Sequence, residues 1–217
     1  MSATSIGLSP ALNAYVVAHS TAPDQVLTDL AARTQALGSL SGMQIAPEEG
    51  AFLTVMTRLV GARSAVEVGT FTGYSSICIA RGLAPGGRLL CCDVSTEWTG
   101  IAREFWERAG VTDRIELVVA PAADTLRALP TDPSVDLAFI DADKTGYLTY
   151  WEELVPRMRP GGVLLVDNVL RDGEVLREDP DEATAAIQAF NDRVVSDERV
   201  DVAMLPLADG VSVAVRR

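Results

Sequence analysis

Histidine and cysteine are nearly absent from this chain, which has one histidine and three cysteines among 217 residues. His19 lies in the N-terminal part, before the segments that alternate as strands and helices, so we expect it at the surface and expect no Ser-His or Cys-His nucleophile pair. Cys78, Cys91 and Cys92 lack metal-binding spacing, and two of them are adjacent in an apolar segment. We therefore expect buried free thiols and a reducing, cytoplasmic location.

Aromatic residues are scarce as well, at 6% of the chain. The three tryptophans fall in predicted helices and are expected to anchor the core rather than to face a ligand. They are Trp98, Trp106 and Trp151.

Basic residues are the third shortage. The 18 Lys and Arg stand against 30 Asp and Glu, which gives a formal net charge of −12, and the basic residues are scattered. A nucleic-acid partner is not expected, because binding a phosphate backbone requires a basic face. No run approaches the ~18 apolar residues of a membrane helix, and the N-terminus does not resemble a secretory signal. These absences favour a small-molecule partner.

The length fits a single domain over residues 1–217. Residues 1–45 are expected to be accessory to the core. The expected accessory elements are helices at 12–18 and 26–37, followed by a loop at 41–46. Pro47 at a first helical position, with Glu48 and Glu49 in the first turn, then predicts a helix to about Val60, because early acidic residues complement the helix dipole.

From residue 65 onward, short apolar segments alternate with helical patterns, which predicts an α/β fold with a mostly parallel sheet covered on both faces. The expected strands are 65–68, 88–94, 115–119, 135–140, 163–166, 200–205 and 211–215. The expected helices are 74–83, 96–109, 122–129, 145–155 and 181–195. The last two strands are separated by too few residues for a parallel crossover, so they must form a hairpin that makes one strand antiparallel.

The segment 66–76, VEVGTFTGYSS, joins the first expected strand to a helix through Gly69 and Gly73. A strand, a glycine turn and a helix in this order are typical of the place where α/β folds bind nucleotides. Asp93 ends the next strand, where a carboxylate can accept hydrogen bonds from ribose hydroxyls. The alternatives are an ordinary tight turn and an aspartate that caps the helix after Ser95. Together the two features favour a ligand that contains a nucleoside.

Oxygen-bearing side chains end two further expected strands. Asp141 follows the strand at 135–140, and Asp167 and Asn168 follow the strand at 163–166. Neighbouring strands lie only about 5 Å apart, so these side chains could converge at one edge of the sheet. Two carboxylates and an amide oxygen suit a hard cation such as Mg²⁺ or Ca²⁺. The alternative is that strand ends collect Asp and Asn as turn formers and caps.

Lys144 follows Asp141 by three residues, in the segment DADK. A lysine at the beginning of a helix is disfavoured by the helix dipole, so its position there calls for a reason. Near a cation and partly desolvated, it could take a proton from an acceptor hydroxyl. The alternative is a solvated surface lysine.

With these residues in place, the sequence from about residue 41 to its end resembles the cation-dependent class I S-adenosylmethionine O-methyltransferases, the group that includes the catechol and caffeoyl-CoA enzymes. The segments that carry the resemblance are VEVGTFTGYSS, FIDADK, VDNVL and the closing LPLADGVSVAVRR. The resemblance implies a Rossmann-like methyltransferase fold and S-adenosylmethionine as cofactor. The residues implied to contact that cofactor are Met43, Glu67, Gly69, Thr70, Ser75, Asp93, Ala122 and Asp141.

The resemblance also implies a metal and base set. It assigns Asp141, Asp167 and Asn168 as ligands of a divalent cation, with Mg²⁺ expected first and Ca²⁺ or Mn²⁺ as alternatives. It assigns Lys144, beside the acceptor, as the base.

Two positions depart from the family pattern. Around the adenine the family usually has Gly-Asp-Ala, whereas this chain has Ala120, Pro121 and Ala122, so an acidic contact is missing while a backbone contact can survive. Arg171 stands where many relatives have an aromatic residue, at the border of the acceptor pocket. It is a candidate substrate residue, because a guanidinium pairs with carboxylate or phosphate groups.

The function expected from these residues is methyl transfer to one hydroxyl of a small vicinal dihydroxy aromatic. A nicotinamide-dependent oxidoreductase is one alternative, although it needs closer glycines and gives no role to Asp141, Asp167 and Asn168 together. A non-catalytic S-adenosylmethionine-binding protein is the other. We also expect a homodimer, in which the N-terminal helices could form the interface.

Overall fold

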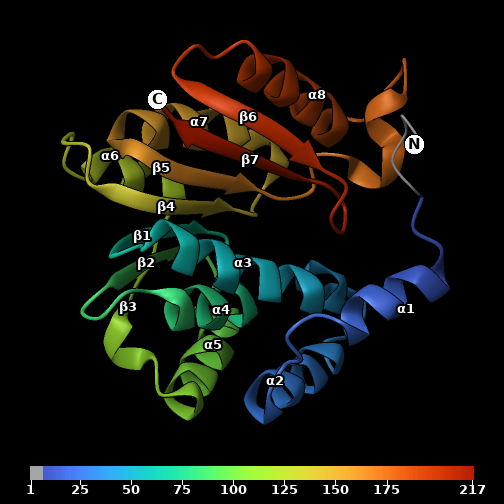
Figure 1. The fold of residues 1–217 in the computed structure, drawn as a ribbon, viewed down its shortest axis with the longest axis vertical. Helices are drawn as coiled ribbons and strands as arrows, with labels where there is room; N and C mark the ends of the chain where they lie inside the picture. The colour runs from blue at the N-terminus through green and yellow to red at the C-terminus, as the bar shows by residue number, and fades with distance from the viewer. Residues whose placement is uncertain (1–6) are drawn as a thin grey trace.

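A single sheet of seven strands runs through residues 7–217, the part of the chain that the computed structural model describes. The strand order is β3-β2-β1-β4-β5-β7-β6, with β1 to β5 parallel and β7 antiparallel to its neighbours (Figure 1). The strands are β1 Ser64–Val68, β2 Arg88–Asp93, β3 Ile115–Val119, β4 Val135–Ile140, β5 Met158–Val166, β6 Val200–Leu205 and β7 Val211–Arg216. The predicted fold class, including the one antiparallel strand from a C-terminal hairpin, is confirmed.

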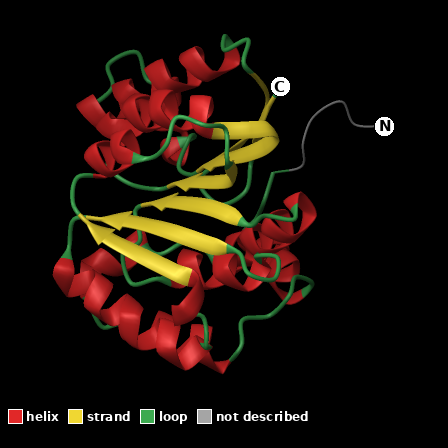
Figure 2. Ribbon diagram, turned by 90° about the vertical axis from the view of Figure 1, so that its left-hand side faces the viewer, coloured by secondary structure: helices red, strands yellow, loops and turns green. Residues whose placement is uncertain are grey.

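Helices cover both faces of this sheet (Figure 2). The α-helices are α1 Pro10–Ala18, α2 Gln25–Gln35, α3 Pro47–Val60, α4 Tyr74–Gly82, α5 Thr96–Ala109, α6 Ala122–Ala128, α7 Tyr147–Leu154 and α8 Glu182–Val195. Residues of α2 to α5 pack in one core, and residues of α6, α7 and α8 pack in a second core on the other face.

The central strands supply side chains to both cores, as the period of a strand requires. In β4, Leu137 and Phe139 belong to the first core, whereas Ala138 and Ile140 belong to the second. All four side chains are fully buried, which explains why the sequence here is an unbroken apolar run rather than an alternating one.

The N-terminal part differs in how firmly it is attached. α2 buries Leu27 and Leu30 against the core, whereas α1 buries none of its residues. The homodimer stays a prediction, as does a single domain over the full length, of which residues 1–6 lie outside the described part. Within residues 7–217, no helix is long and apolar enough to cross a membrane.

Several predicted boundaries were wrong. The expected loop at 41–46 is partly a 3₁₀ helix, Gly38–Met43. The helix expected at 145–155 starts as a 3₁₀ turn at Lys144–Gly146 and becomes α7 only at Tyr147. β5 begins at Met158 rather than 163, because Met158 pairs with Val135 ahead of an irregularity in the register. Gly161 and Gly162 lie in this part of the strand, and glycine is not typical of strands, so the sequence pattern did not predict it.

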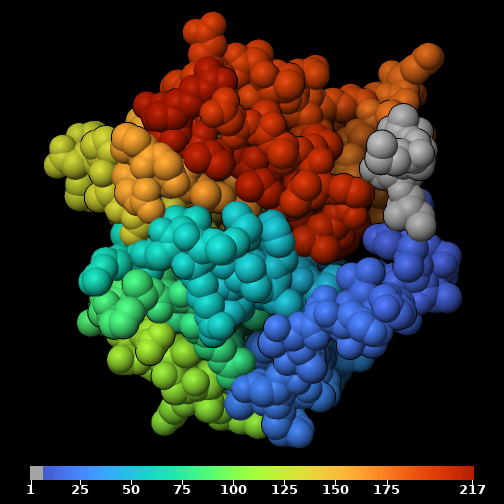
Figure 3. Space-filling view, viewed as in Figure 1, coloured from blue at the N-terminus to red at the C-terminus, as the bar shows by residue number. Residues whose placement is uncertain are grey.

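The histidine expected at the surface and the cysteines expected in the core lie where the sequence predicted them. His19 is exposed and stacks on Tyr15, and the three cysteines are buried and free. On the face shown in Figure 3, the C-terminal hairpin in red lies next to α3 in cyan.

Candidate active site

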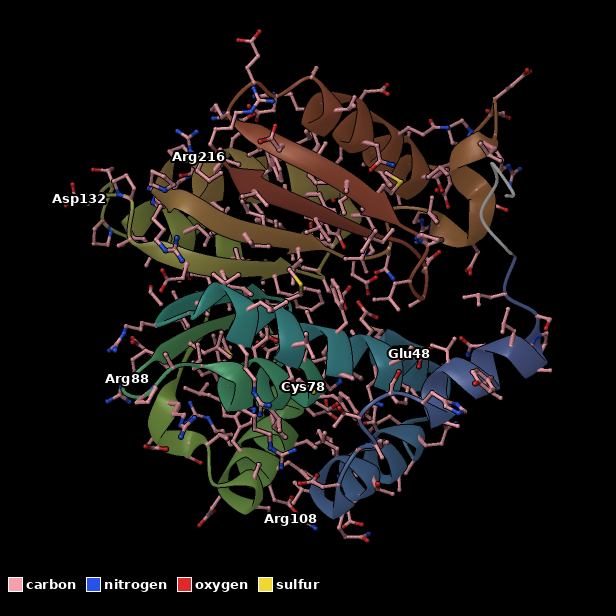
Figure 4. The ribbon with its side chains drawn as sticks, viewed as in Figure 1. Glu48, Cys78, Arg88, Arg108, Asp132 and Arg216 are labelled. Carbon is pink, nitrogen blue, oxygen red and sulfur yellow. The ribbon has the colours of Figure 1, made fainter. Side chains whose placement is uncertain are left out.

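A cavity of about 830 Å³ opens at the carboxyl edge of the parallel strands. In Figure 1 the arrowheads of β4 and β5 point toward the side of the molecule where α1 and α2 lie. Figure 4 shows Arg88, at the start of β2, and Asp132, before β4, at the opposite side from Glu48 at the start of α3. The walls come from the turns that follow β1 to β5, from the segment before α3, and from the turn between β6 and β7.

The glycine turn after β1 lies directly against the end of β4. Gly69 has a φ of 92°, and a Cβ atom built on it would lie 1.8 Å from the backbone oxygen of Asp141. No side chain can occupy this position, so the glycine is required by close approach as well as by its backbone conformation. This contact brings the two predicted halves of the site together.

Asp93 fastens the same turn to the end of β2. One carboxylate oxygen accepts hydrogen bonds from the backbone nitrogens of Thr70 and Phe71, at 3.0 and 2.8 Å, and the other accepts one from the backbone of Ser95 at 2.8 Å. Asp93 also lines the cavity. The cap of α5 is Ser95, whose hydroxyl accepts a 3.2 Å hydrogen bond from the Trp98 backbone nitrogen. Asp93 therefore braces the chain before α5 rather than capping the helix, and it faces the ligand space.

Glu67 is not on the wall of the cavity. Its side chain is fully buried behind the turn, where the Thr70 hydroxyl donates a 3.0 Å hydrogen bond to Oε2. Burial raises the pKa of Glu67 to about 7. Glu67 thus supports Thr70 and is not among the residues that line the cavity, and its contact with a cofactor stays a prediction.

The other residues predicted to contact a cofactor line the cavity, and their cofactor roles stay predictions. They are Met43, Gly69, Thr70, Ser75, Asp93, Ala122 and Asp141. Ala120 and Pro121 lie on the same wall.

One tryptophan was assigned wrongly. Trp106 and Trp151 are core residues as expected, but Trp98 is half-buried on the cavity wall and packs edge-to-face against Phe71, with ring centroids 5.2 Å apart. Its place in the first turn after the acidic end of β2 was the available signal, since that turn faces the carboxyl edge of the sheet.

The predicted metal and base residues meet at the ends of β4 and β5. The Lys144 ammonium donates hydrogen bonds to Asp141 Oδ1 at 3.1 Å, to Asn168 Oδ1 at 2.5 Å and to the Tyr147 hydroxyl at 2.7 Å. Tyr147 in turn donates to the backbone oxygen of Asp167 at 3.0 Å. The lysine side chain is only 14% exposed, so it is not the solvated surface lysine of the alternative interpretation.

Carboxyl groups crowd this end of the cavity. Burial and the negative charge of Asp141 raise the pKa of Asp167 to about 7. Burial also raises the pKa of Asp141, although the neighbouring Lys144 opposes the shift. A third carboxyl, that of Glu49, joins them, and burial together with the charges of Asp167 and Asp141 raises its pKa to about 9.

Sequence reasoning missed Glu49, because an acid in a first helical turn is accounted for by the helix dipole.

The charge on the cavity wall is strongly negative. Two basic residues line it, Lys144 and Arg171. The acidic residues on the wall are Glu49, Asp93, Asp141, Asp143, Asp167, Asp172 and Asp209. Arg171 lies beside the cavity as predicted, with one guanidinium nitrogen 3.8 Å from Asp181 and with Nε buried and lacking a hydrogen-bond partner among the described residues.

The oxygen donors have the chemistry of a hard-cation site. Within the described part of the chain, however, no three His, Cys, Asp or Glu side chains are already arranged to hold a metal ion. The Lys144 ammonium itself lies between the oxygens of Asp141 and Asn168. These oxygens therefore already converge on a positive charge, and a divalent cation would have to displace the ammonium to reach both of them.

The fold and the cavity define a Rossmann-like α/β protein with its ligand site at the carboxyl edge of the sheet. The chain belongs to the O-methyltransferase family, whose model matches residues 17–217. It is thus an enzyme of that family, which excludes the nicotinamide-dependent alternative.

Known proteins similar to this chain agree with that assignment. The catechol O-methyltransferase of Mycobacterium tuberculosis is 37% identical over 178 residues, which cover 82% of this chain and 80% of the relative. The caffeoyl-CoA O-methyltransferase of Populus kitakamiensis is 34% identical over 221 residues, covering 96% and 94%. A crystal structure of an O-methyltransferase from Bacillus cereus in complex with SAH superposes with a TM-score of 0.87 at 33% identity, covering 95% and 97% of the two chains.

Replacing Gly69 by alanine tests the contact that holds the two halves of the site together. We expect Gly69→Ala to lower the free energy of unfolding by about 2 kcal/mol or more, because the new methyl group strains the turn and overlaps the Asp141 carbonyl. Gly100→Ala in α5 is the control: its Cβ would meet nothing within 4 Å, and it should stabilise the helix by about 0.5–1 kcal/mol. Urea denaturation measures both. Equal stability of Gly69→Ala and the wild type would contradict the close contact.

Proposed function

We propose that this enzyme transfers the methyl group of S-adenosylmethionine to one hydroxyl of a small vicinal dihydroxy aromatic, with the help of a divalent cation. The observation that carries the proposal is the position of Lys144, Asp141 and Asn168 in one cavity with the glycine turn and Asp93. The SAH complex of the Bacillus cereus neighbour supports the choice of donor, and the names of the two relatives support the class of acceptor.

The donor end would be formed by the glycine turn. Asp93 faces the cavity and can accept hydrogen bonds from ribose hydroxyls, while Thr70, Ser75 and Ala122 lie on the wall around it. Trp98, on the same cavity wall as Asp93, adds an aromatic surface suited to packing against a planar base.

The acceptor end would be formed by Asp141, Asp167 and Asn168. Their oxygens suit Mg²⁺, and Mn²⁺ or Ca²⁺ as alternatives. A bound cation supplies positive charge that makes an aromatic hydroxyl easier to deprotonate. Asp141 lies against the glycine turn, so the hydroxyl oxygen held at this end would lie close to the sulfonium methyl at the other.

Lys144 is the proposed base. As the neutral amine, its Nζ would accept the proton of the hydroxyl as the new oxygen–carbon bond forms and the carbon–sulfur bond breaks. Tyr147 positions the amine, because its hydroxyl is held by the Asp167 backbone and contacts Nζ at 2.7 Å.

The reaction and its cation requirement are tested together. With S-adenosylmethionine, Mg²⁺ and 3,4-dihydroxybenzaldehyde, we expect a singly methylated product by mass spectrometry, at least a 100-fold loss of rate in EDTA, and a similar loss for Asp141→Ala. Asp132→Ala, at the far end of the sheet, is the control and should keep the wild-type rate. Full activity of Asp141→Ala in EDTA would refute the cation site. A protein that binds SAH but methylates no diphenol would be the non-catalytic alternative.

Lys144 is tested with two substitutions. We expect Lys144→Ala to lower kcat by roughly 10²–10⁴-fold and to change its pH profile, because a general base is lost. Lys144→Arg should be as inactive, since a guanidinium keeps the charge but cannot accept a proton. If the arginine variant keeps wild-type kcat, or if the alanine variant keeps the wild-type pH profile, Lys144 is not the base.

Arg171 motivates a narrower substrate class, acceptors that carry an acidic group. Its buried Nε has no hydrogen-bond partner among residues 7–217, and a guanidinium binds carboxylates well. We expect Arg171→Ala to lower the ratio of kcat/KM for 3,4-dihydroxybenzoate over 3,4-dihydroxybenzaldehyde by about ten-fold. Arg177→Ala is the control, because Arg177 lies on the same segment, exposed and paired with Glu174. An unchanged ratio in Arg171→Ala would refute this preference.

A further inference from the structure

Glu49 is an unusually placed carboxyl group. It lies in the first turn of α3, is 1% exposed and lines the cavity. Its Oε1 atom has no hydrogen-bond partner within residues 7–217. Burying a carboxylate without a partner is costly, so such a group normally has a compensating positive charge or ligand.

The start of the helix does not account for this placement. A glutamate at the third position of a helix can accept a hydrogen bond from the backbone nitrogen of the N-cap residue, here Ala46. That hydrogen bond uses only one of the two carboxylate oxygens of Glu49. The helix dipole favours a negative charge here whichever way the side chain points. Glu48 precedes Glu49 in the same turn and is not among the residues that line the cavity.

The neighbours of Glu49 indicate what could satisfy it. Glu49 lines the same cavity as Asp141 and Asp167. Three carboxyl groups from three elements, α3 and the ends of β4 and β5, thus face the same space. The two basic residues of the cavity wall have other partners: Lys144 donates to Asp141, Asn168 and Tyr147, and Arg171 lies beside Asp181. Within residues 7–217, Glu49 therefore has no ion-pair partner.

We propose that Glu49 is a third carboxylate for the divalent cation at the ends of β4 and β5, acting on the ion directly or through one of its waters. The inference rests on the cation site of the proposed function. A small doubly charged ion would stabilise three carboxylates that line one cavity and a buried oxygen that lacks a partner among the described residues, and carboxylate ligands suit Mg²⁺ or Mn²⁺. The positive ammonium group of the methyl donor is the competing explanation.

The test is Mn²⁺ binding to the purified protein without donor or acceptor, measured by calorimetry or electron paramagnetic resonance. We expect Glu49→Gln to weaken Mn²⁺ binding about ten-fold or more, the scale found when groups around a metal are removed. Glutamine keeps the size of the side chain and an oxygen for the Ala46 backbone, so α3 should start normally. Glu48→Gln makes the same change one residue earlier and should bind Mn²⁺ within two-fold of the wild type.

Two further measurements separate the explanations. SAH binding to Glu49→Gln, measured without cation, should match the wild type; a loss of SAH affinity with unchanged Mn²⁺ affinity would assign Glu49 to the donor and overturn the proposal. Glu49→Asp keeps a carboxylate and should bind Mn²⁺ better than Glu49→Gln. Unfolding curves establish that each variant is folded, and if Glu49→Gln does not fold, weakened binding by Glu49→Asp decides the question.

The outcome for the wild type distinguishes this inference from the function on which it rests. A wild type that does not bind Mn²⁺ refutes both the cation site and the role of Glu49. A wild type that binds Mn²⁺, with Glu49→Gln binding equally well, refutes the role of Glu49 alone.

Discussion

The close approach of the glycine turn to the end of β4 is the contact on which the rest of the site depends. A side chain at Gly69 would overlap the backbone oxygen of Asp141, so the turn after β1 and the acidic end of β4 form one continuous wall. β1 and β4 are neighbours in the sheet because the strand order reverses between them, and ligands of doubly wound sheets bind where that reversal opens a crevice. One contact thereby places the proposed donor and acceptor ends side by side.

The second constraint is electrostatic. The walls of the cavity carry far more acidic than basic groups. Burial and the negative charge of neighbouring carboxylates raise the pKa values of Glu49 and Asp167 there. Lys144 is the only lysine in the chain, whose other seventeen basic residues are arginines. An arginine stays protonated in proteins, so the cavity holds the one basic side chain of the chain that could both balance these acids and give up its proton.

Much of the architecture could be predicted from the sequence because it depends on local pattern. The buried strands are apolar runs, the glycines mark the turn after β1, and the residues at the strand ends follow directly from the strand boundaries. Errors occurred where tertiary contacts override local preference. β5 extends back to Met158 through a proline and two glycines because pairing with β4 holds it, and Trp98 faces the cavity because α5 starts at its rim.

The sequence by itself determined the order of strands and helices and the residues at the carboxyl ends of the strands: Gly69, Asp93, Asp141, Asp167 and Asn168. These are properties of neighbouring residues, and parallel pairing brings such ends to one edge. Only the tertiary structure decided the environment of each side chain. Glu67 is enclosed behind the turn and Glu49 faces the carboxyls of β4 and β5, because burial and the distance between charges depend on helices and strands far apart in the sequence.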